Sequence, residues 1–363
     1  MEQFLVAIHR ACNLTFTRHQ CLKSFFNNDW ERAWKAHISE WQQADVDIRA
    51  IQTFFANRNK VSPEKEMERL QKCGARILLH GTPEYPASLS QIHHPPVLLF
   101  RRGELREDDF PAVAVVGSRR LSRYGQRAAE LIVGQLADAG VTIVSGLAFG
   151  ADTVAHRVAL EHGARTIAVL GNGIDTIYPS ANQQFAEKFL AEGRGVILSE
   201  YLPGTEGRAE HFPVRNRIVS GLSRATIVLE AAIKSGSLIT AELAIQQNRD
   251  LFVVPGDIFS KTSEGCNHLI SRGSAAPALS GEQVLHALEF HHLASKKSAK
   301  RAIPTTENEA LILTVFADQA EWHIDDLLRA VSLPGAVTSS TVSILEIKGL
   351  IQNLGNHIYA RTL

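Results

Sequence analysis

Cysteine is scarce in this sequence, and long apolar runs are missing. The four cysteines form no C-x-x-C pair, so we expect reduced thiols rather than structural disulfides or a zinc site. These cysteines are Cys12, Cys21, Cys73 and Cys266. No apolar segment is long enough to span a bilayer, and the N-terminus shows an early acidic residue and no signal-peptide pattern. We therefore predict a cytoplasmic protein with no metal ligands and no membrane partner.

An excess of charge of one sign is also missing. The 363 residues include 38 lysines and arginines against 38 aspartates and glutamates, which gives a net charge of zero. This balance excludes a protein that is basic over its whole surface, but it allows a local basic groove. Hydrophobic residues make up 45% and charged residues 21%, as in ordinary globular proteins of two or three domains.

Several signatures of nucleotide binding and catalysis are absent. No G-x-G-x-x-G fingerprint follows the strand-like run VAVV, and there is no Walker A motif, which disfavours dinucleotide binding and P-loop ATPase activity. G-x-S-x-G and H-E-x-x-H are missing too, which removes the most recognisable signs of a hydrolase and a metalloprotease.

Residues 1–61 are predicted to form a helical domain, because their apolar residues recur at helical spacing. In the segment that follows, Ser62 suits an N-cap, Pro63 the first helical position and Gly74 the C-terminal cap. We place a domain boundary near residue 61.

Residues 62–290 alternate apolar strand-like runs with helical patterns. The runs are ARILL, VAVVG, VTIVSG, TIAVLG, GVILSE, ATIVLE and LFVVPG. Each is apolar on both faces, as strands of a covered parallel sheet are. The alternation predicts an α/β fold with a doubly wound parallel sheet.

Residues 291–303 are predicted to be a linker, and 304–363 a winged-helix domain with three helices and a hairpin that turns at residues 354–356. Its expected recognition helix, 339–350, carries only Lys348 as a base, beside Glu346. Protein contact or weak DNA binding is therefore favoured over sequence-specific reading of a duplex.

Polar and glycine-rich segments follow the predicted strands, where open α/β sheets bind their ligands. Glycines let backbone amides approach a phosphate, helix N-termini favour anions, and arginines add forked donors. The candidate phosphate-binding residues are Gly117, Ser118, Arg119, Ser145, Gly146, Asn172, Arg215, Asn216, Arg217, Gly236 and Ser237. Any single glycine here can instead serve only the tight turn.

Other polar residues near these strand ends allow two interpretations each. Asp152 and His156 are either an acid–base couple or a structural link between a loop and a helix, and the structural role is favoured. Glu200 and Glu230 are either a carboxylate pair or caps and partners of nearby arginines.

Aromatic residues near the strand ends are candidates for stacking on nucleic-acid bases. These residues are Phe149, Tyr178 and Phe185. Packing in the core is the alternative, and it is the commoner role of an aromatic ring.

The strand-end motifs occur in an order that resembles a known family. The motifs are VAVVGSRRLSRYG, VSGLAFGADTVAHRVAL, AVLGNGIDTIYPSAN, LSEYLPGT, FPVRNRIVSGLSRATIVLEAAIKSGSLITAELA, FVVPGD and SEGCNHLISRGSA. Over roughly residues 75–285 they resemble the DNA-processing protein A family (DprA, also called Smf).

This resemblance implies an extended Rossmann-like domain between an N-terminal domain like a sterile alpha motif (SAM) and a C-terminal winged helix. It implies a homodimer that binds single-stranded DNA, protects incoming strands in natural transformation and loads RecA, with neither catalysis nor a cofactor. Arg119, in the motif GSR, is the implied DNA contact. A basic residue usually follows the motif YP, but Ser180 stands there in this chain, and Lys188 is a possible substitute.

Two other functions stay open at this point. A nucleotide phosphoribohydrolase would carry P-G-G-x-G-T-x-x-E, and the corresponding SGSLITAELA keeps Thr240 and Glu242 but not the tandem glycines. A structural scaffold whose winged helix recruits partners is the other alternative.

Overall fold

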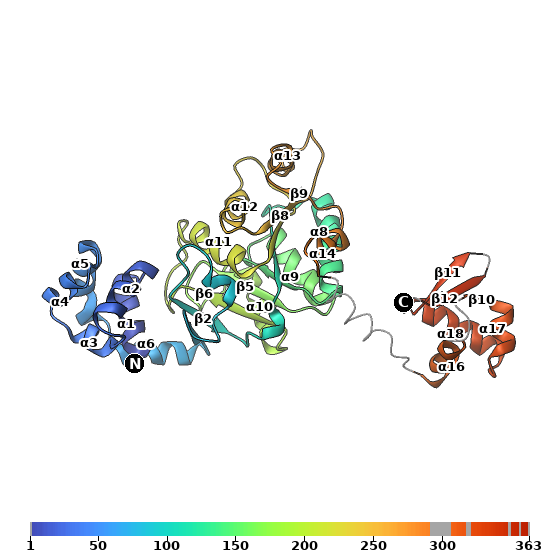
Figure 1. The fold of residues 1–363 in the computed structure, drawn as a ribbon, viewed down its shortest axis with the longest axis horizontal. Coiled ribbons are helices and arrows are strands. Elements are labelled where there is room, and N and C mark those ends of the chain that lie inside the picture. Colours follow the sequence, from blue (N-terminus) through green and yellow to red (C-terminus); the bar gives the residue numbers. More distant parts are fainter. Residues whose placement is uncertain (1, 291–305, 317–320, 348–349, 356, 362–363) are drawn as a thin grey trace. The chain divides into compact units, whose positions relative to one another are not determined.

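The computed structural model describes residues 2–290, 306–316, 321–347, 350–355 and 357–361 (Figure 1). The chain forms two compact units, Met1–Glu289 and Phe290–Leu363. Across the described segments, no helix is both long and apolar enough to pass through a membrane.

The first unit begins with a bundle of short helices. They are α1 (Glu2–Cys12), α2 (Phe16–Phe25), α3 (Trp30–Lys35), α4 (Ile38–Gln43), α5 (Ile48–Asn57) and α6 (Pro63–Lys72). At the start of α6, the Ser62 side chain accepts a hydrogen bond from Lys65 N and Pro63 occupies the first turn, as predicted. In the core of the bundle, Trp41 stacks on Phe54 with ring centroids 4.0 Å apart.

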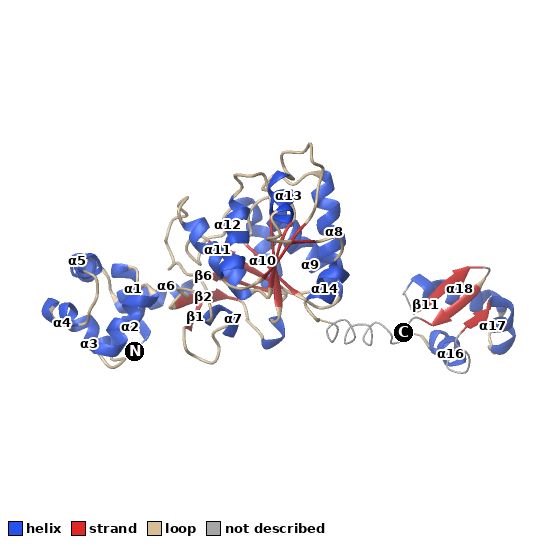
Figure 2. Cartoon of the chain, turned by 45° about the horizontal axis from the view of Figure 1, so that its top comes forward, coloured by secondary structure: helices blue, strands red, loops and turns tan. Residues whose placement is uncertain are grey.

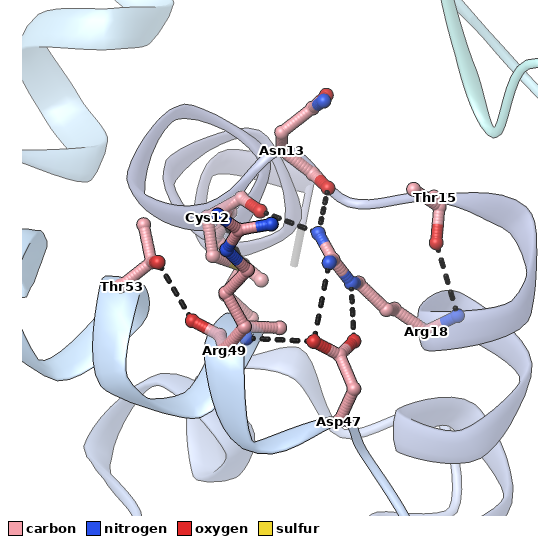
Figure 3. Close-up of polar contacts among 9 residues, drawn as sticks. Cys12, Asn13, Thr15, Arg18, Asp47, Arg49 and Thr53 are labelled. Carbon is pink, nitrogen blue, oxygen red and sulfur yellow. Dashed lines mark hydrogen bonds and ion pairs between the residues drawn. The ribbon is translucent and has the colours of Figure 1, made fainter.

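Arg18 of α2 ties the bundle together (Figure 3). Its Nε donates to Asp47 Oδ2 at 2.7 Å, and its Nη1 donates to the carbonyl oxygens of Cys12 and Asn13 at 3.0 and 2.9 Å. Because Cys12 ends α1 and Asp47 caps α5, this one guanidinium joins three segments of the bundle.

A nine-stranded sheet follows, in the order β1-β2-β6-β5-β4-β3-β7-β8-β9. The strands are β1 (Arg76–Leu79), β2 (Leu98–Arg102), β3 (Ala112–Val116), β4 (Thr142–Ser145), β5 (Thr166–Leu170), β6 (Gly195–Ser199), β7 (Ala225–Val228), β8 (Asp250–Val253) and β9 (Ala276–Pro277). Neighbours from β6 to β9 pair in parallel, whereas β1 pairs with β2, and β2 with β6, antiparallel.

The helices connecting these strands lie on both sides of the sheet (Figure 2). They are α7 (Ala87–Ser90), α8 (Arg123–Asp138), α9 (Ala151–Glu161), α10 (Gln183–Ala191), α11 (His211–Leu222), α12 (Gly236–Gln246), α13 (Glu264–Ser271) and α14 (Gly281–Ala287). Right-handed crossovers place α8 and α9 on one face and α11 and α12 on the other, because the chain leaves β3 and β7 in opposite directions. The predicted doubly wound α/β fold is confirmed.

Two details of the sheet differ from the sequence prediction. The run ARILL was expected in the parallel part, but it forms β1 and pairs antiparallel at the edge. Strand β2 was missed, because its sequence LLFRR ends in two arginines and breaks the apolar pattern of a covered strand.

The helical bundle and the sheet share one hydrophobic core. Leu5 and Trp41 of the bundle belong to the same buried cluster as Leu98 and Phe100 of β2. The residues on both sides of the boundary expected near residue 61 belong to one compact unit. That boundary between two domains stays a prediction. The expected linker, 291–303, lies outside the described residues.

The second unit has its own core and a small antiparallel sheet. Its described elements are α16 (Glu307–Val315), β10 (Glu321–His323), α17 (Ile324–Ala330), α18 (Gly335–Ile347), β11 (Ile351–Gly355) and β12 (Ile358–Arg361), with strand order β10-β12-β11. The predicted hairpin is confirmed as β11 and β12, and β10 was not foreseen. Lys348 lies outside the described residues.

Phe100→Ala should lower the free energy of unfolding of the first unit by about 3–5 kcal/mol, because it empties a fully buried site in the shared core. Urea unfolding followed by circular dichroism and by tryptophan fluorescence checks this, since Trp30, Trp34 and Trp41 all report on the bundle. Both signals should shift together. Ile48→Ala is the control, because Ile48 is 72% exposed and its loss should change stability little. A fluorescence transition that does not move with Phe100→Ala would contradict the shared core.

Candidate functional site

A pocket lies at the carboxyl ends of the central strands, where β3 leads to one side of the sheet and β7 to the other. Ligands of doubly wound sheets bind at this topological switch point. The cavity has a volume of about 520 Å³. The predicted site residues that line it are Gly117, Arg119, Tyr178, Arg215, Asn216, Gly236 and Ser237.

One wall of the pocket is the N-terminus of α12. Ser235 caps the helix, and its side chain accepts a hydrogen bond from Ser237 N at 3.3 Å. Gly236 is exposed, and a Cβ added to it would meet no atom within 4 Å. The amides of Ser237 and Leu238 bond to Ser235, but the amide of Gly236 has no hydrogen bond to a described residue. It lies at the positive end of a helix dipole, which favours an anion.

Arg119 lies on the opposite side of the switch point, in the loop after β3. It is exposed, and no hydrogen bond or ion pair links its side chain to another described residue. The loop itself is ordered by Ser118, whose Oγ donates to Arg120 O at 3.0 Å and accepts from Arg120 N at 3.1 Å. A fixed backbone thus presents a guanidinium that is available to a ligand.

Arg215 has a different role, although it also borders the pocket. It is only 5% exposed, and its Nη1 donates to Gly146 O at 2.8 Å and to Val169 O. Its Nε donates to Asn216 Oδ1 at 3.1 Å. A Cβ at Gly146 would collide with this guanidinium, so the glycine that was predicted to approach a phosphate approaches Arg215 instead.

Asp152 supplies the charge that opposes Arg215. It is buried, and its Oδ2 accepts from Gly146 N at 3.1 Å and from Ala148 N at 3.3 Å. Burial raises the pKa of Asp152, whereas Arg215 and the two amides lower it. Burial likewise lowers the pKa of Arg215, and Asp152 opposes that shift. The attraction between the two charges therefore offsets part of the cost of burying each of them.

His156 does not bond to Asp152. Its Nδ1 lies 2.5 Å from Thr166 Oγ1, and burial, with a smaller effect of Arg215, lowers the pKa of His156 to about 3. The imidazole is therefore neutral at pH 7. The contacts of Asp152 and His156 are structural, as the sequence analysis favoured.

Arg217 is not among the described residues that line the pocket, and its side chain is bonded within the protein. Its Nη2 donates to Glu200 Oε1 at 2.6 Å, and its Nε donates to His94 O at 3.2 Å. Glu230 instead accepts from the backbone and side chain of Ser122. Glu200 and Glu230 thus have separate partners, and one of the expected arginine–glutamate pairs is present.

The remaining predicted phosphate ligands do not line the cavity. Ser145 is fully buried and donates to Val115 O at 2.6 Å. Asn172 is buried, and its Nδ2 donates to Thr176 O at 2.6 Å. Both side chains hold the backbone at strand ends, and a direct role for them in binding remains a prediction.

The aromatic candidates are placed differently from one another. Tyr178 is 54% exposed and lines the pocket, with its ring centroid 5.6 Å from that of Phe212. Phe149 is 50% exposed but outside the lining. Phe185 packs edge-on against Phe189, next to the core.

Part of the pocket lining was not predicted from the sequence. Phe212, Gly207 and Ala209 border the pocket, and exposed Arg208 lies between the last two. These four residues belong to the loop after β6 and the start of α11. In that stretch, Gly204 and Gly207 were the only features of the sequence that could have indicated a binding loop. Ser180 and Lys188 are not among the described residues that line the pocket.

The family model for DNA recombination-mediator protein A matches residues 76–289. The chain belongs to this family. DNA processing protein DprA of Streptococcus pneumoniae is 48% identical over 206 residues, which cover 57% of this chain and 72% of that protein. Protein Smf of Escherichia coli is 39% identical over 280 residues, which cover 75% of this chain and 74% of that protein.

Solved structures of family members agree with the fold. DprA from S. pneumoniae matches 80% of this chain and 99% of its own, with a TM-score of 0.70 and 37% identity. A structure describing the single-stranded DNA binding mode of DNA processing protein A from Helicobacter pylori matches 59% of this chain and 95% of its own, with a TM-score of 0.53 and 31% identity. Membership of this family gives the chain a role in DNA processing as a recombination mediator.

Arg215→Ala should lower the free energy of unfolding by about 3–5 kcal/mol, because it leaves Asp152 buried without its counter-charge and two carbonyls without a donor. Thermal and urea unfolding measure the loss. Arg215→Lys should recover only part of the stability, because a single ammonium cannot replace the fork of a guanidinium. Arg119→Ala, at an exposed arginine, should stay within about 0.5 kcal/mol of the unmodified chain. Equal stabilities for Arg215→Ala and Arg119→Ala would refute this division of roles.

Proposed function

We propose that the chain binds single-stranded DNA in this pocket, protects the incoming strand in natural transformation and loads RecA on it. The observation that carries the proposal is the pairing of Arg119, which has no ion pair with any described residue, with the open N-terminus of α12. A family member from H. pylori is described by its mode of single-stranded DNA binding, which supports the same ligand here.

The chemistry of the pocket suits a single strand. A backbone phosphate is held by a forked cation and by backbone amides, whereas bases stack on exposed rings. Arg119, Gly236 and Ser237 supply the first kind of contact, and exposed Tyr178, with half-buried Phe212 beside it, supplies the second. With so few cations, the affinity should depend on salt less steeply than that of a broadly basic binder.

The proposal includes partners but no reaction. The chain acts as a homodimer through the α/β domain, and RecA takes over the bound strand. Ile258 and Phe259, 78% and 90% exposed on the loop after β8, suit a contact with a second copy of the chain. No cofactor and no catalytic step are assigned to the pocket. Glu242, the acidic residue of the phosphoribohydrolase alternative, is not among the described residues lining the pocket, which disfavours that alternative.

Arg119→Ala should weaken binding of an oligothymidylate by about tenfold, because among the described residues lining the pocket it removes the one arginine whose side chain is not bonded within the protein. The slope of log affinity against log salt should fall by about 0.7, the change expected for one phosphate contact on a single strand. Fluorescence anisotropy over a salt series measures both quantities. RecA assembly on a strand coated with single-strand-binding protein should be slowed in parallel.

Arg49→Ala is the matched control, since Arg49 is an exposed arginine on α5 (Figure 3) and is not among the described residues lining the pocket. It should bind DNA as the unmodified chain does. Equal affinities for Arg119→Ala and Arg49→Ala would reject the pocket as the binding site. Release of free base from a nucleoside monophosphate would favour an enzyme.

A further inference from the structure

The loop between β6 and α11, residues 200–210, forms a wall of the pocket. Gly207 and Ala209 line the cavity, and Arg208 between them is exposed. The position of this loop therefore sets the width of the pocket and the place of exposed Arg208 beside it.

The first half of the loop is fastened to the strand ends. Gly204 N donates to both carboxylate oxygens of Asp175 at 3.0 Å, and Gly173 N donates to Thr205 O at 2.8 Å. These bonds hold the loop against the segment after β5. The second half of the loop, residues 206–210, is exposed throughout, so its position depends on the fastened first half.

A further fastening comes from the N-terminal helices. Arg10 of α1 donates through Nη2 to the carbonyl oxygen of Pro203 at 2.6 Å, across 193 positions of sequence. Its Nε donates to Glu66 Oε2 of α6 at 2.8 Å. Glu66 is itself buried and also accepts from Arg69 at 2.7 Å, so the guanidinium is oriented by a fixed carboxylate.

Packing supports the same connection. Leu202, beside Pro203, is 3% exposed and belongs to the hydrophobic cluster shared by the helical bundle and the sheet. His9, the neighbour of Arg10, lies with its ring centroid 6.4 Å from that of Phe100 on β2. The segment of α1 that holds the loop is thus seated on the α/β domain.

We propose that Arg10 is a positioning residue for the pocket, through which the N-terminal helices hold the loop 200–210 in the form that binds single-stranded DNA. This inference rests on the proposed function for its ligand. Arg10 does not touch the DNA in this account. It acts by holding the carbonyl of Pro203, and through it the segment that ends in Gly207, Arg208 and Ala209.

The test compares three substitutions in the full-length chain. Arg10→Ala removes the fastening from α1, and Asp175→Ala removes the fastening at Gly204 from the α/β side. Arg18→Ala is the control, because the described partners of Arg18 all lie within the helical bundle (Figure 3). Amide hydrogen exchange of residues 200–210 is measured without DNA, and affinity for an oligothymidylate is measured separately.

Arg10→Ala and Asp175→Ala should each raise amide exchange in the loop by about tenfold and weaken DNA binding by about fivefold, as expected when the loop loses one of its charge-assisted fastenings. Arg18→Ala should change neither quantity. Arg10→Lys, which keeps one donor and the charge, should restore part of both.

Unchanged loop exchange in Arg10→Ala would overturn the inference, and so would an equal effect of Arg18→Ala, which would show general loosening of the bundle. Faster loop exchange in Arg10→Ala with undiminished DNA affinity would also overturn it. If the unmodified chain fails to bind DNA, the proposed function is wrong, and loop exchange alone then decides whether Arg10 holds the loop.

Discussion

A guanidinium buried at the carboxyl edge of the sheet is the constraint on which the site depends. Arg215 joins the ends of β4 and β5 through the carbonyls of Gly146 and Val169, and Asp152 at the start of α9 balances its charge. The backbone groups of loops at the end of a parallel sheet have no hydrogen bonds to a neighbouring strand. Where these groups are buried, side chains must supply the missing partners. With Arg215 in this position, the rim of the pocket is fixed before any ligand arrives.

Three arginines of similar sequence context, Arg119, Arg215 and Arg217, have different roles in this arrangement. Arg215 is structural, Arg217 pairs with Glu200, and Arg119 has no ion pair with another described residue. A binding site that depends on one free cation and a helix N-terminus can release its ligand as well as hold it, because each contact is individually modest. Such exchange suits a protein proposed to hand a DNA strand to a recombinase.

Most of the fold could be predicted because parallel strands covered on both faces read as continuous apolar runs. Strand β2 could not, since its last two residues are arginines and it lies in the antiparallel part of the sheet, between β1 and β6. For the site, Gly117, Arg119 and Gly236 followed from the rule that ligands meet the carboxyl ends of strands. The roles of Arg215 and Arg217 did not follow, because residues two apart on a helix point to nearly opposite sides, and only tertiary packing decides which side is buried.

The most direct measurement is a crystal structure of the full-length chain with a short oligothymidylate. The account predicts a phosphate between the guanidinium of Arg119 and the first amides of α12, with Arg215 still bonded to the carbonyls of Gly146 and Val169. A strand bound outside this pocket, or a phosphate held by Arg215 after it has left those carbonyls, would contradict it.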